Sequence, residues 1–249
     1  MAVAQVAVAV GLALAAIALS AAARLGLERD IAVVAVRAIV QLTVVGLVVT
    51  LVFEHVSLAA AFVAVMLAAA ALTSAHRLAG LPRARAVALA SIGLPALAAL
   101  GVLLAAGAFP TTPRGVIPVA GILIGGAMAA VSLGGRRLGD ALRDGLEEIE
   151  TRLALGAPAR EALRPTVRSA VSTALVPVLD QTRTVGLVTL PGTFVGLVLG
   201  GASPAEAARV QLTVLLALIF VELAAALLLA RLVTVAWRAP GERVREPVG

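Results

Sequence analysis

The sequence predicts an all-α, polytopic membrane protein: a bundle of about seven transmembrane helices. Hydrophobic residues make up 61% of its 249 residues, whereas soluble globular domains are about 45–50% apolar. Uncharged apolar runs long enough to cross a hydrocarbon core of ~30 Å recur along the chain. None of these runs shows the alternation of apolar and polar residues that is typical of β-barrel strands.

The apolar runs divide the chain into seven predicted spans. They lie at about residues 2–22, 31–53, 57–75, 86–108, 116–134, 183–201 and 207–235. No soluble stretch is large enough to bury a core of its own, so residues 1–249 are predicted to form one transmembrane domain. The first run is not preceded by basic residues, which disfavours a cleaved signal peptide.

Arginine placement predicts the orientation of the spans. All 20 basic residues are arginine, and they concentrate in alternate connections and around the end of the last span. The other connections hold only Arg114 and Arg209. Because cytoplasmic connections carry the excess of basic residues, we expect the N-terminus outside and the C-terminus in the cytoplasm. The same distribution explains the net charge of +6 and argues against a nucleic-acid partner.

The longest cytoplasmic connection, about residues 136–175, is predicted to form a helical hairpin between the fifth and sixth spans. Its first helix runs through Leu155 and has one apolar stripe, formed by Leu142, Leu146, Ile149 and Leu153. Gly156 ends this helix, Pro158 suits the first turn of a short second helix, and Pro165 interrupts that second helix.

Two spans carry polar side chains on one helix face. Arg37 and Gln41 are four residues apart in the second span, and Gln211 and Glu222 are eleven apart in the last. Glu222 lies near the predicted bilayer midplane, where an acid is costly and is a functional candidate. Both pairs could form a polar seam along a translocation pathway. The alternatives are that Arg37 snorkels to the headgroups and that Glu222 makes a structural hydrogen bond to a neighbouring helix.

The sixth predicted span contains residues that disturb a helix. Pro191 removes a backbone hydrogen bond and predicts a kink. Gly192, Gly196 and Gly200 predict a small-residue face that allows another helix to pack closely. Asp180 lies at the predicted cytoplasmic end of this span. Discontinuous helices form substrate sites in transporters, so the span is a pathway candidate, and a kinked helix without a ligand is the alternative.

The sequence offers little for catalysis or metal binding. It has no cysteine and no lysine, which excludes thiolate sites and the G-x-x-x-x-G-K-[ST] loop that binds ATP. His55 and His76 fall at opposite predicted membrane boundaries, and no Ser–His pair shares one depth. A solvated Glu54–His55 pair is favoured over a metal site at the outer face. We therefore expect no enzymatic activity and no cofactor in this chain, and no metal ligands are identified.

Residues 150–163 resemble the cytoplasmic coupling loop of ABC-transporter permeases. The stretch ETRLALGAPAREAL has an acidic, alanine-containing start, a glycine after six residues and a short helix. In such permeases the short helix docks into a groove of the ATPase subunit. The resemblance implies coupling roles for Glu150, Arg152, Gly156, Ala157, Pro158 and Glu161.

A longer resemblance identifies one family. Three stretches are similar, in order, to the FetB-type (YbbM-like) iron-export permeases, which have plant relatives linked to aluminium tolerance: LERDIAVVAVRAIVQLTVVG (27–46), VIPVAGILIGGAMAAVSL (116–133) and LVPVLDQTRTVGLVTLPGTFVGLVLGGASPAEAARVQL (175–212). The resemblance implies a permease homodimer that binds two copies of a separate ATPase, which holds ATP and Mg. The family pattern has two methionines where this chain has Thr193 and Phe194, and it has no acid at Glu222.

The sequence therefore predicts the permease subunit of an ABC transporter in the bacterial cell (inner) membrane, with iron or another metal-related solute as exported cargo. Two alternatives are an organic solute such as a nucleotide sugar, and a membrane scaffold or sensor that recruits a cytoplasmic partner without transport. The residues expected to form the pathway or polar seam are Arg37, Gln41, Asp180, Pro191, Gly192, Gln211 and Glu222.

Overall fold

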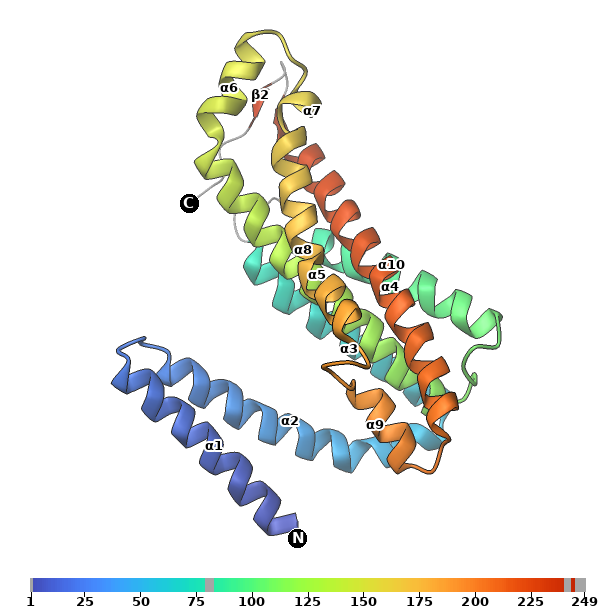
Figure 1. Ribbon diagram of the computed structural model, residues 1–249. Coiled ribbons are helices and arrows are strands. Elements are labelled where there is room, and N and C mark those ends of the chain that lie inside the picture. The colour runs from blue at the N-terminus through green and yellow to red at the C-terminus, as the bar shows by residue number, and fades with distance from the viewer. Residues whose placement is uncertain (1, 79–82, 240–242, 245–249) are drawn as a thin grey trace. The chain divides into compact units, whose positions relative to one another are not determined.

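The computed structural model describes residues 2–78, 83–239 and 243–244 and is built almost entirely of helices (Figure 1). The predicted all-α fold class is confirmed. The chain forms two compact units, Met1–His55 and Val56–Gly249. Within the described ranges, six helices are long and apolar enough to cross a membrane, one fewer than the seven predicted spans.

The first unit is a helical hairpin. Its helices are α1 (Ala2–Ala22) and α2 (Glu28–Glu54). The buried Ser20 closes the turn between them. Its hydroxyl donates to Glu28 Oε1 at 2.7 Å and accepts from the Leu27 N–H at 3.2 Å. One serine therefore fixes the start of α2 against the end of α1.

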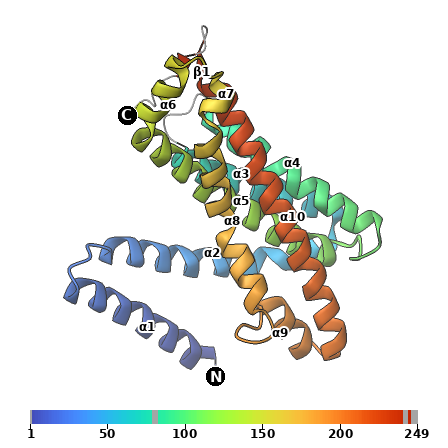
Figure 2. The same cartoon turned by 45° about the horizontal axis from the view of Figure 1, so that its top comes forward.

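The second unit contains the other elements. They are α3 (Val56–Arg77), α4 (Ala84–Ala105), α5 (Pro113–Asp144), α6 (Leu146–Ala154), α7 (Ala159–Ala162), α8 (Arg164–Thr184), α9 (Gly192–Leu199), α10 (Pro204–Trp237), β1 (Arg238–Ala239) and β2 (Arg243–Val244). The two strands pair antiparallel. Helix α5 is central, because α3, α4, α8 and α10 all pack against it (Figure 2).

Helical periodicity and small residues explain the packing around α5. The buried residues of α10 recur three and four apart and include Ala207, Val214, Leu218, Val221, Ala225, Leu229 and Val233. They form one face of the helix. On α5, a Cβ added to Gly134 would lie 3.4 Å from Ala174 Cβ and 3.5 Å from Leu229 Cδ2. The absence of a side chain at Gly134 thus lets α8 and α10 pack closely on α5.

Helix α5 extends beyond the apolar part of the bundle. Its 32 residues correspond to about 48 Å, more than a hydrocarbon core of ~30 Å. The C-terminal part carries charged residues from Arg136 to Asp144 and leads to α6 and α7 at that end of the unit (Figure 1). The helix that was predicted to continue through Leu155 instead breaks at Gly145, where the chain bends into α6. Pro165 does not interrupt a helix but lies in the first turn of α8, a position that proline tolerates.

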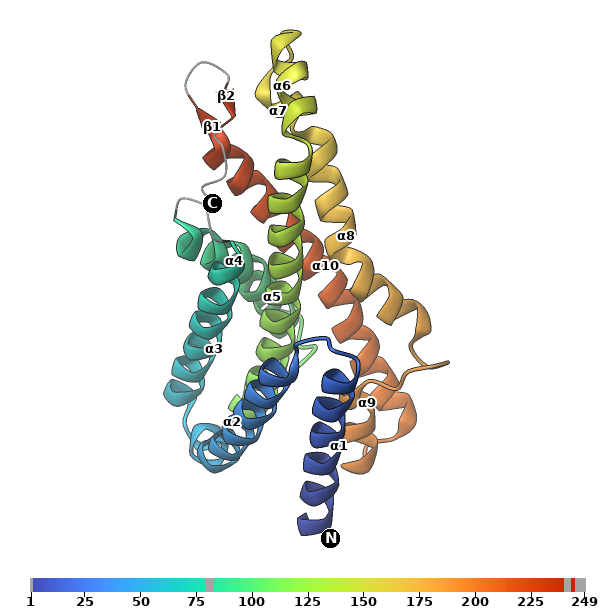
Figure 3. The same ribbon diagram turned by 90° about the vertical axis from the view of Figure 1, so that its left-hand side faces the viewer.

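The segment predicted as the sixth span, residues 183–201, is not one kinked helix, so that prediction is wrong. Helix α8 ends at Thr184, and α9 begins only at Gly192 (Figure 3). Between them, a bridge joins Val185 and Thr189, and Gly186 has a φ of +81°. Glycine permits this left-handed backbone, and Pro191 forces the preceding residue away from the helical region. The two together break the helix fully.

Helix α8 precedes the break and packs against α5. Ala174 faces Gly134 of α5, and Gln181, further along α8, lines the same cavity as Ile122 and Gly126 of α5. The second half of α8 therefore lies at the depth of the uncharged stretch of α5. Asp180 lies in the second half of α8, not at the start of a span. It is exposed and pairs with the exposed Arg183 at 3.2 Å.

Candidate functional site

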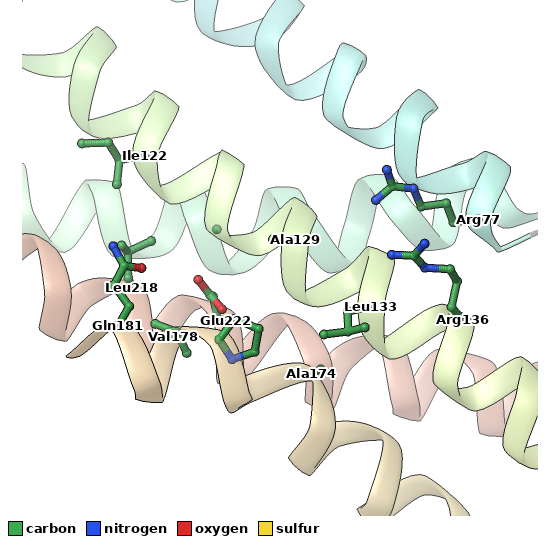
Figure 4. Close-up of a pocket in the computed structure, with 12 residues that line it drawn as sticks. Arg77, Ile122, Ala129, Leu133, Arg136, Ala174, Val178, Gln181, Leu218 and Glu222 are labelled. Atoms are coloured by element: carbon green, nitrogen blue, oxygen red, sulfur yellow. The ribbon is translucent and has the colours of Figure 1, made fainter. Parts of the chain in front are cut away.

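A cavity of about 470 Å³ lies between α5, α8 and α10, and the end of α3 also contributes to its lining (Figure 4). Four of its lining residues are polar or charged: Arg77, Arg136, Gln181 and Glu222. The other lining residues are apolar. The cavity therefore combines a mainly apolar wall with a few polar groups, the usual composition of a small-molecule site.

Helix α5 forms one wall of the cavity with a regular row of residues. The row consists of Ile122, Gly126, Ala129, Leu133 and Arg136, whose spacing of four and three puts them on one helix face. From first to last it covers about 21 Å of helix axis. The cavity is therefore elongated along α5, and it runs from the apolar interior to the charged end that leads to the hairpin.

Glu222 of α10 lies at the inner end of the cavity. The residue is only 7% exposed. A Cβ added to Gly126 would lie 2.9 Å from Glu222 Oε1 and 2.5 Å from Leu218 Cδ2. Gly126 therefore provides the space in which the carboxylate sits. Among the residues that the structure describes, none forms a hydrogen bond with this carboxylate, and Glu222 lines the cavity instead.

Gln181 of α8 lies at the same end as Glu222 (Figure 4). The sequence prediction selected its neighbour Asp180. Consecutive residues of a helix point about 100° apart, and only Gln181 of the two lines the cavity. Asp180 instead pairs with Arg183. Hydropathy gave no reason to choose Gln181. In the sequence its neutral amide lies close to the charged residues Asp180 and Arg183, which are the stronger candidates for a site.

Arg77 of α3 and Arg136 of α5 lie at the opposite end of the cavity (Figure 4). Both side chains are exposed, and within the described part of the chain neither forms an ion pair with a carboxylate. Sequence reasoning used both only to orient the spans. The helical spacing from Ile122 to Arg136 could have identified Arg136, whereas the position of Arg77 depends on how α3 packs against α5.

Gln211 shares the buried face of α10 with Glu222, as predicted. It is 6% exposed, and its Oε1 has no hydrogen-bond partner among the described residues. It does not line the cavity. Both polar residues of this face are therefore buried, but of the two only Glu222 lines the cavity.

Arg37 and Gln41 share one face of α2 in the first unit, as their spacing predicts. Together with Ala32, Val33, Val36 and Val40 they line a shallow groove of about 500 Å³. Its remaining lining is aliphatic. An arginine in such surroundings needs an anionic or polar partner, or headgroups that its side chain can reach.

Pro191 and Gly192 do not line the cavity. Pro191 is the residue that precedes α9, and Gly192 is the first residue of α9. A Cβ added at Gly192 or Gly196 would meet nothing within 4 Å, and at Gly200 it would meet only the backbone of α9 itself. The predicted close packing of another helix on these glycines is therefore not formed within the described part of this chain.

The turn between α6 and α7 has the predicted geometry. Gly156 has a φ of +88°. Its N–H donates to the Leu153 carbonyl at 2.9 Å, and the Ala157 N–H donates to the Arg152 carbonyl at 3.0 Å. This pair of bonds is a Schellman motif, which satisfies the last carbonyls of α6. Pro158 then precedes α7 and accepts from the Glu161 N–H at 2.8 Å. The hairpin is therefore a defined structure.

The hairpin has one side whose residues are buried and one side whose residues are exposed. Its buried side chains are Ile149, Ala159, Ala162 and Leu163. On the outside, Glu150 and Glu161 are exposed, and Arg152 pairs with Glu148 at 2.7 Å. Leu155 is 83% exposed at the tip, beyond the apolar part of the bundle. Leu155, Glu150 and Glu161 are therefore all accessible on the surface of the hairpin.

Comparison with known proteins identifies the family. The uncharacterised protein family UPF0014 matches residues 3–237, nearly the whole chain. This chain belongs to the UPF0014 family. The FetB-type resemblance is thereby confirmed, and the UPF0014 chain is a multi-pass membrane protein with six helices, among those described, that can span a bilayer.

Three relatives of the UPF0014 chain come from plants and a bacterium. UPF0014 membrane protein STAR2 of Oryza sativa subsp. japonica is 39% identical over 202 residues, 80% of this chain and 71% of the relative. Protein ALUMINUM SENSITIVE 3 of Arabidopsis thaliana is 37% identical over 205 residues, 80% and 74%. Probable iron export permease protein FetB of Escherichia coli (strain K12) is 34% identical over 212 residues, 84% and 82%. No solved structure matches the chain significantly.

Proposed function

We propose that this chain is the permease subunit of an ABC transporter that exports iron or another metal-related solute across the bacterial inner membrane. Membership of the UPF0014 family supports the proposal, as does a relative named as a probable iron export permease. ATP and Mg are held by a separate ATPase, because this chain lacks the lysine of a phosphate-binding loop.

The hairpin of α6 and α7 is the observation that carries the proposal. It joins α5 to α8, and these two helices also line the cavity. A partner that moves the hairpin therefore moves two walls of the cavity, because rigid helices transmit displacement along their length. The exposed Leu155 and the acids Glu150 and Glu161 form the surface on which the ATPase docks.

Transport then follows an alternating-access cycle. Closure of the ATPase on ATP pushes the hairpin, and α5 and α8 pass this displacement to the cavity. The break between Thr184 and Gly192 allows α8 to move without α9. Because the ATPase closes only when ATP is bound, nucleotide shifts the population between inward-open and outward-open states.

The proposed assembly contains two permease copies and two ATPase copies. The family resemblance is its main support. The uncovered glycines Gly192 and Gly196 offer a second permease copy a surface of small residues, where helices in membranes approach closely.

Purification of the full chain from its native membranes tests the docking role. The tagged wild type is expected to retain an ATP-binding-cassette subunit, identified by mass spectrometry, together with ATPase activity. Gly156→Pro should lose both, because proline cannot adopt a φ of +88° and lacks the N–H that caps α6. Glu161→Arg should lose them through charge reversal on the docking surface.

Gly107→Pro is the matched control for Gly156→Pro. Gly107 also has a positive φ of +67°, and its N–H also donates to a carbonyl, that of Leu104 at 3.0 Å. It lies in the connection between α4 and α5, at the other end of α5 from the hairpin. Unchanged co-purification of Gly156→Pro, or equal loss with Gly107→Pro, would refute the docking role.

A further inference from the structure

We infer that the cavity between α5, α8 and α10 binds a hydroxyl-bearing organic anion. Arg77 and Arg136 hold its anionic group, and Glu222 and Gln181 bind its hydroxyl groups. That this ligand is the transported cargo rests on the proposed function. Binding itself is a property of the cavity and can be measured without transport.

The arginine end of the cavity suits an anionic group. The two guanidinium groups come from different helices, α3 and α5, and lie at the same end of the cavity (Figure 4). Neither has a carboxylate partner among the residues that the structure describes. Guanidinium groups bind carboxylate and phosphate oxygens through paired hydrogen bonds. Two guanidinium groups at the same end of the cavity attract anions and repel cations.

The inner end suits hydroxyl groups. The carboxylate of Glu222 accepts hydrogen bonds, and the amide of Gln181 both donates and accepts. Hydroxyl groups can satisfy both. An acyl chain at this end would bury the carboxylate against hydrocarbon, which is unfavourable. The inner end therefore disfavours an anionic lipid as the occupant.

A bare metal ion does not fit the same groups. Within the described residues, no three His, Cys, Asp or Glu side chains are close enough to hold a metal ion. Hard cations take about six or more oxygen ligands, and here Glu222 is the only acid in the cavity lining. If iron is the cargo, it therefore crosses as a complex in which the organic anion supplies the ligands.

The length of the cavity favours an elongated anion. Gly126, which faces Glu222, is ten residues from Arg136 on α5, or about 15 Å along the helix axis. Part of this distance is covered by the long arginine side chains. Gluconate is a suitable probe, because it is a linear monoanion with its carboxylate at one end and hydroxyl groups along the rest.

Titration calorimetry on the full chain in phosphatidylcholine nanodiscs tests the inference. The matched probes are gluconate, hexanoate (an anion without hydroxyls), sorbitol (hydroxyls without the anion) and ferrous chloride without air. Gluconate should bind at least tenfold more tightly than hexanoate or sorbitol. Arg77→Gln and Arg136→Gln should each weaken gluconate about ten- to hundredfold, because each removes a charge-assisted hydrogen bond. Glu222→Gln should weaken gluconate and leave the weak binding of hexanoate unchanged.

Arg85→Gln is the charge control, because Arg85 is exposed at the start of α4 and does not line the cavity. The inference is overturned if Arg85→Gln weakens gluconate as much as the cavity variants do. It is also overturned if ferrous chloride alone binds and displaces gluconate, if no probe binds, or if anionic phosphatidylglycerol in the nanodisc abolishes gluconate binding.

Transport assays separate this inference from the proposed function. Gluconate binding without ATP-driven transport of iron or gluconate by the complex would refute the function and leave the site intact. ATP-driven iron transport that is unaffected by Arg77→Gln and Arg136→Gln would refute the site and leave the function intact.

Discussion

Gly126 leaves the space that the Glu222 carboxylate occupies, because it faces that side chain where α10 packs on α5. We predict that Gly126→Ala is less stable than Gly125→Ala by about 1 kcal/mol, the low end of the cost of overpacking, because the ends of two flexible side chains must shift to admit the new Cβ. The new Cβ would lie 2.5 Å from Leu218 Cδ2 and 2.9 Å from Glu222 Oε1. Thermal unfolding of the full chain in detergent measures the effect, and gluconate binding should fall with it.

Gly125→Ala is the matched control on the neighbouring residue. A Cβ at Gly125 would meet nothing within 4 Å, and alanine is favoured over glycine in a helix by about 1 kcal/mol. Its unfolding temperature should equal or exceed that of the wild type. Equal destabilisation by both substitutions would show that the space beside Glu222 does not decide the result.

Some residues of the site could be predicted from the sequence and others could not. Glu222 was identifiable because an acid in a long apolar helix is conspicuous. Gly126 was not, because glycine spacing does not show which glycine faces a neighbour: a Cβ added to Gly121 would lie 2.7 Å from Met66 Cε, and one added to Gly125 would meet nothing within 4 Å. Gln181 likewise becomes significant only once α8 is placed against α5.

At the scale of the elements, a buried hydrogen bond joins α3 to α5. Ser74 and Ser132 lie 3.0 Å apart between their hydroxyl oxygens, and both are buried. We predict that Ser132→Ala costs about 0.5–2 kcal/mol, because it leaves the Ser74 hydroxyl without this partner. The double variant with Ser74→Ala should cost less than the sum of the single variants. A double-mutant cycle on unfolding in detergent measures this coupling, and strict additivity would contradict it.

The break between α8 and α9 gives a second prediction at this scale. Gly186→Val should destabilise the protein by about 1–2 kcal/mol, because a side chain is disfavoured at a φ of +81°. Gly192→Ala is the control, since Gly192 is helical and has open space around it. Unfolding of both variants in detergent gives the comparison. A Gly186→Val protein as stable as Gly192→Ala would contradict the claim that the break between α8 and α9 requires the positive φ of Gly186.

Hydropathy located most helices, but it placed the sixth span at residues 183–201, where the structure has no continuous helix. A window of apolar residues detects segments that face lipid. Helix α8 packs against α5 and α10, and its second half carries Asp180 and Gln181, so its composition does not resemble a span. The break at residues 185–191 was expected only as a kink, because proline alone does not show that a helix ends. The hairpin turn was predictable, because Gly156 and Pro158 act locally.

At the scale of the whole molecule, the central claim is that a partner supplies the ATP chemistry. The proposed complex of two permeases and two ATPases predicts a defined mass. Native mass spectrometry of the complex, released from detergent, should show two copies of this chain with two ATPase chains. A stable complex with a single permease copy would contradict the proposed stoichiometry.

The most direct test of this claim is ATP-driven iron transport into inside-out proteoliposomes that contain the purified complex. Wild-type complex should accumulate iron, supplied with gluconate, only when ATP and Mg are present outside. The Gly107→Pro complex should transport at a similar rate, and chain carrying Gly156→Pro should not transport, because its hairpin no longer engages the ATPase. Iron accumulation that is independent of ATP, or full transport with Gly156→Pro, would contradict the account.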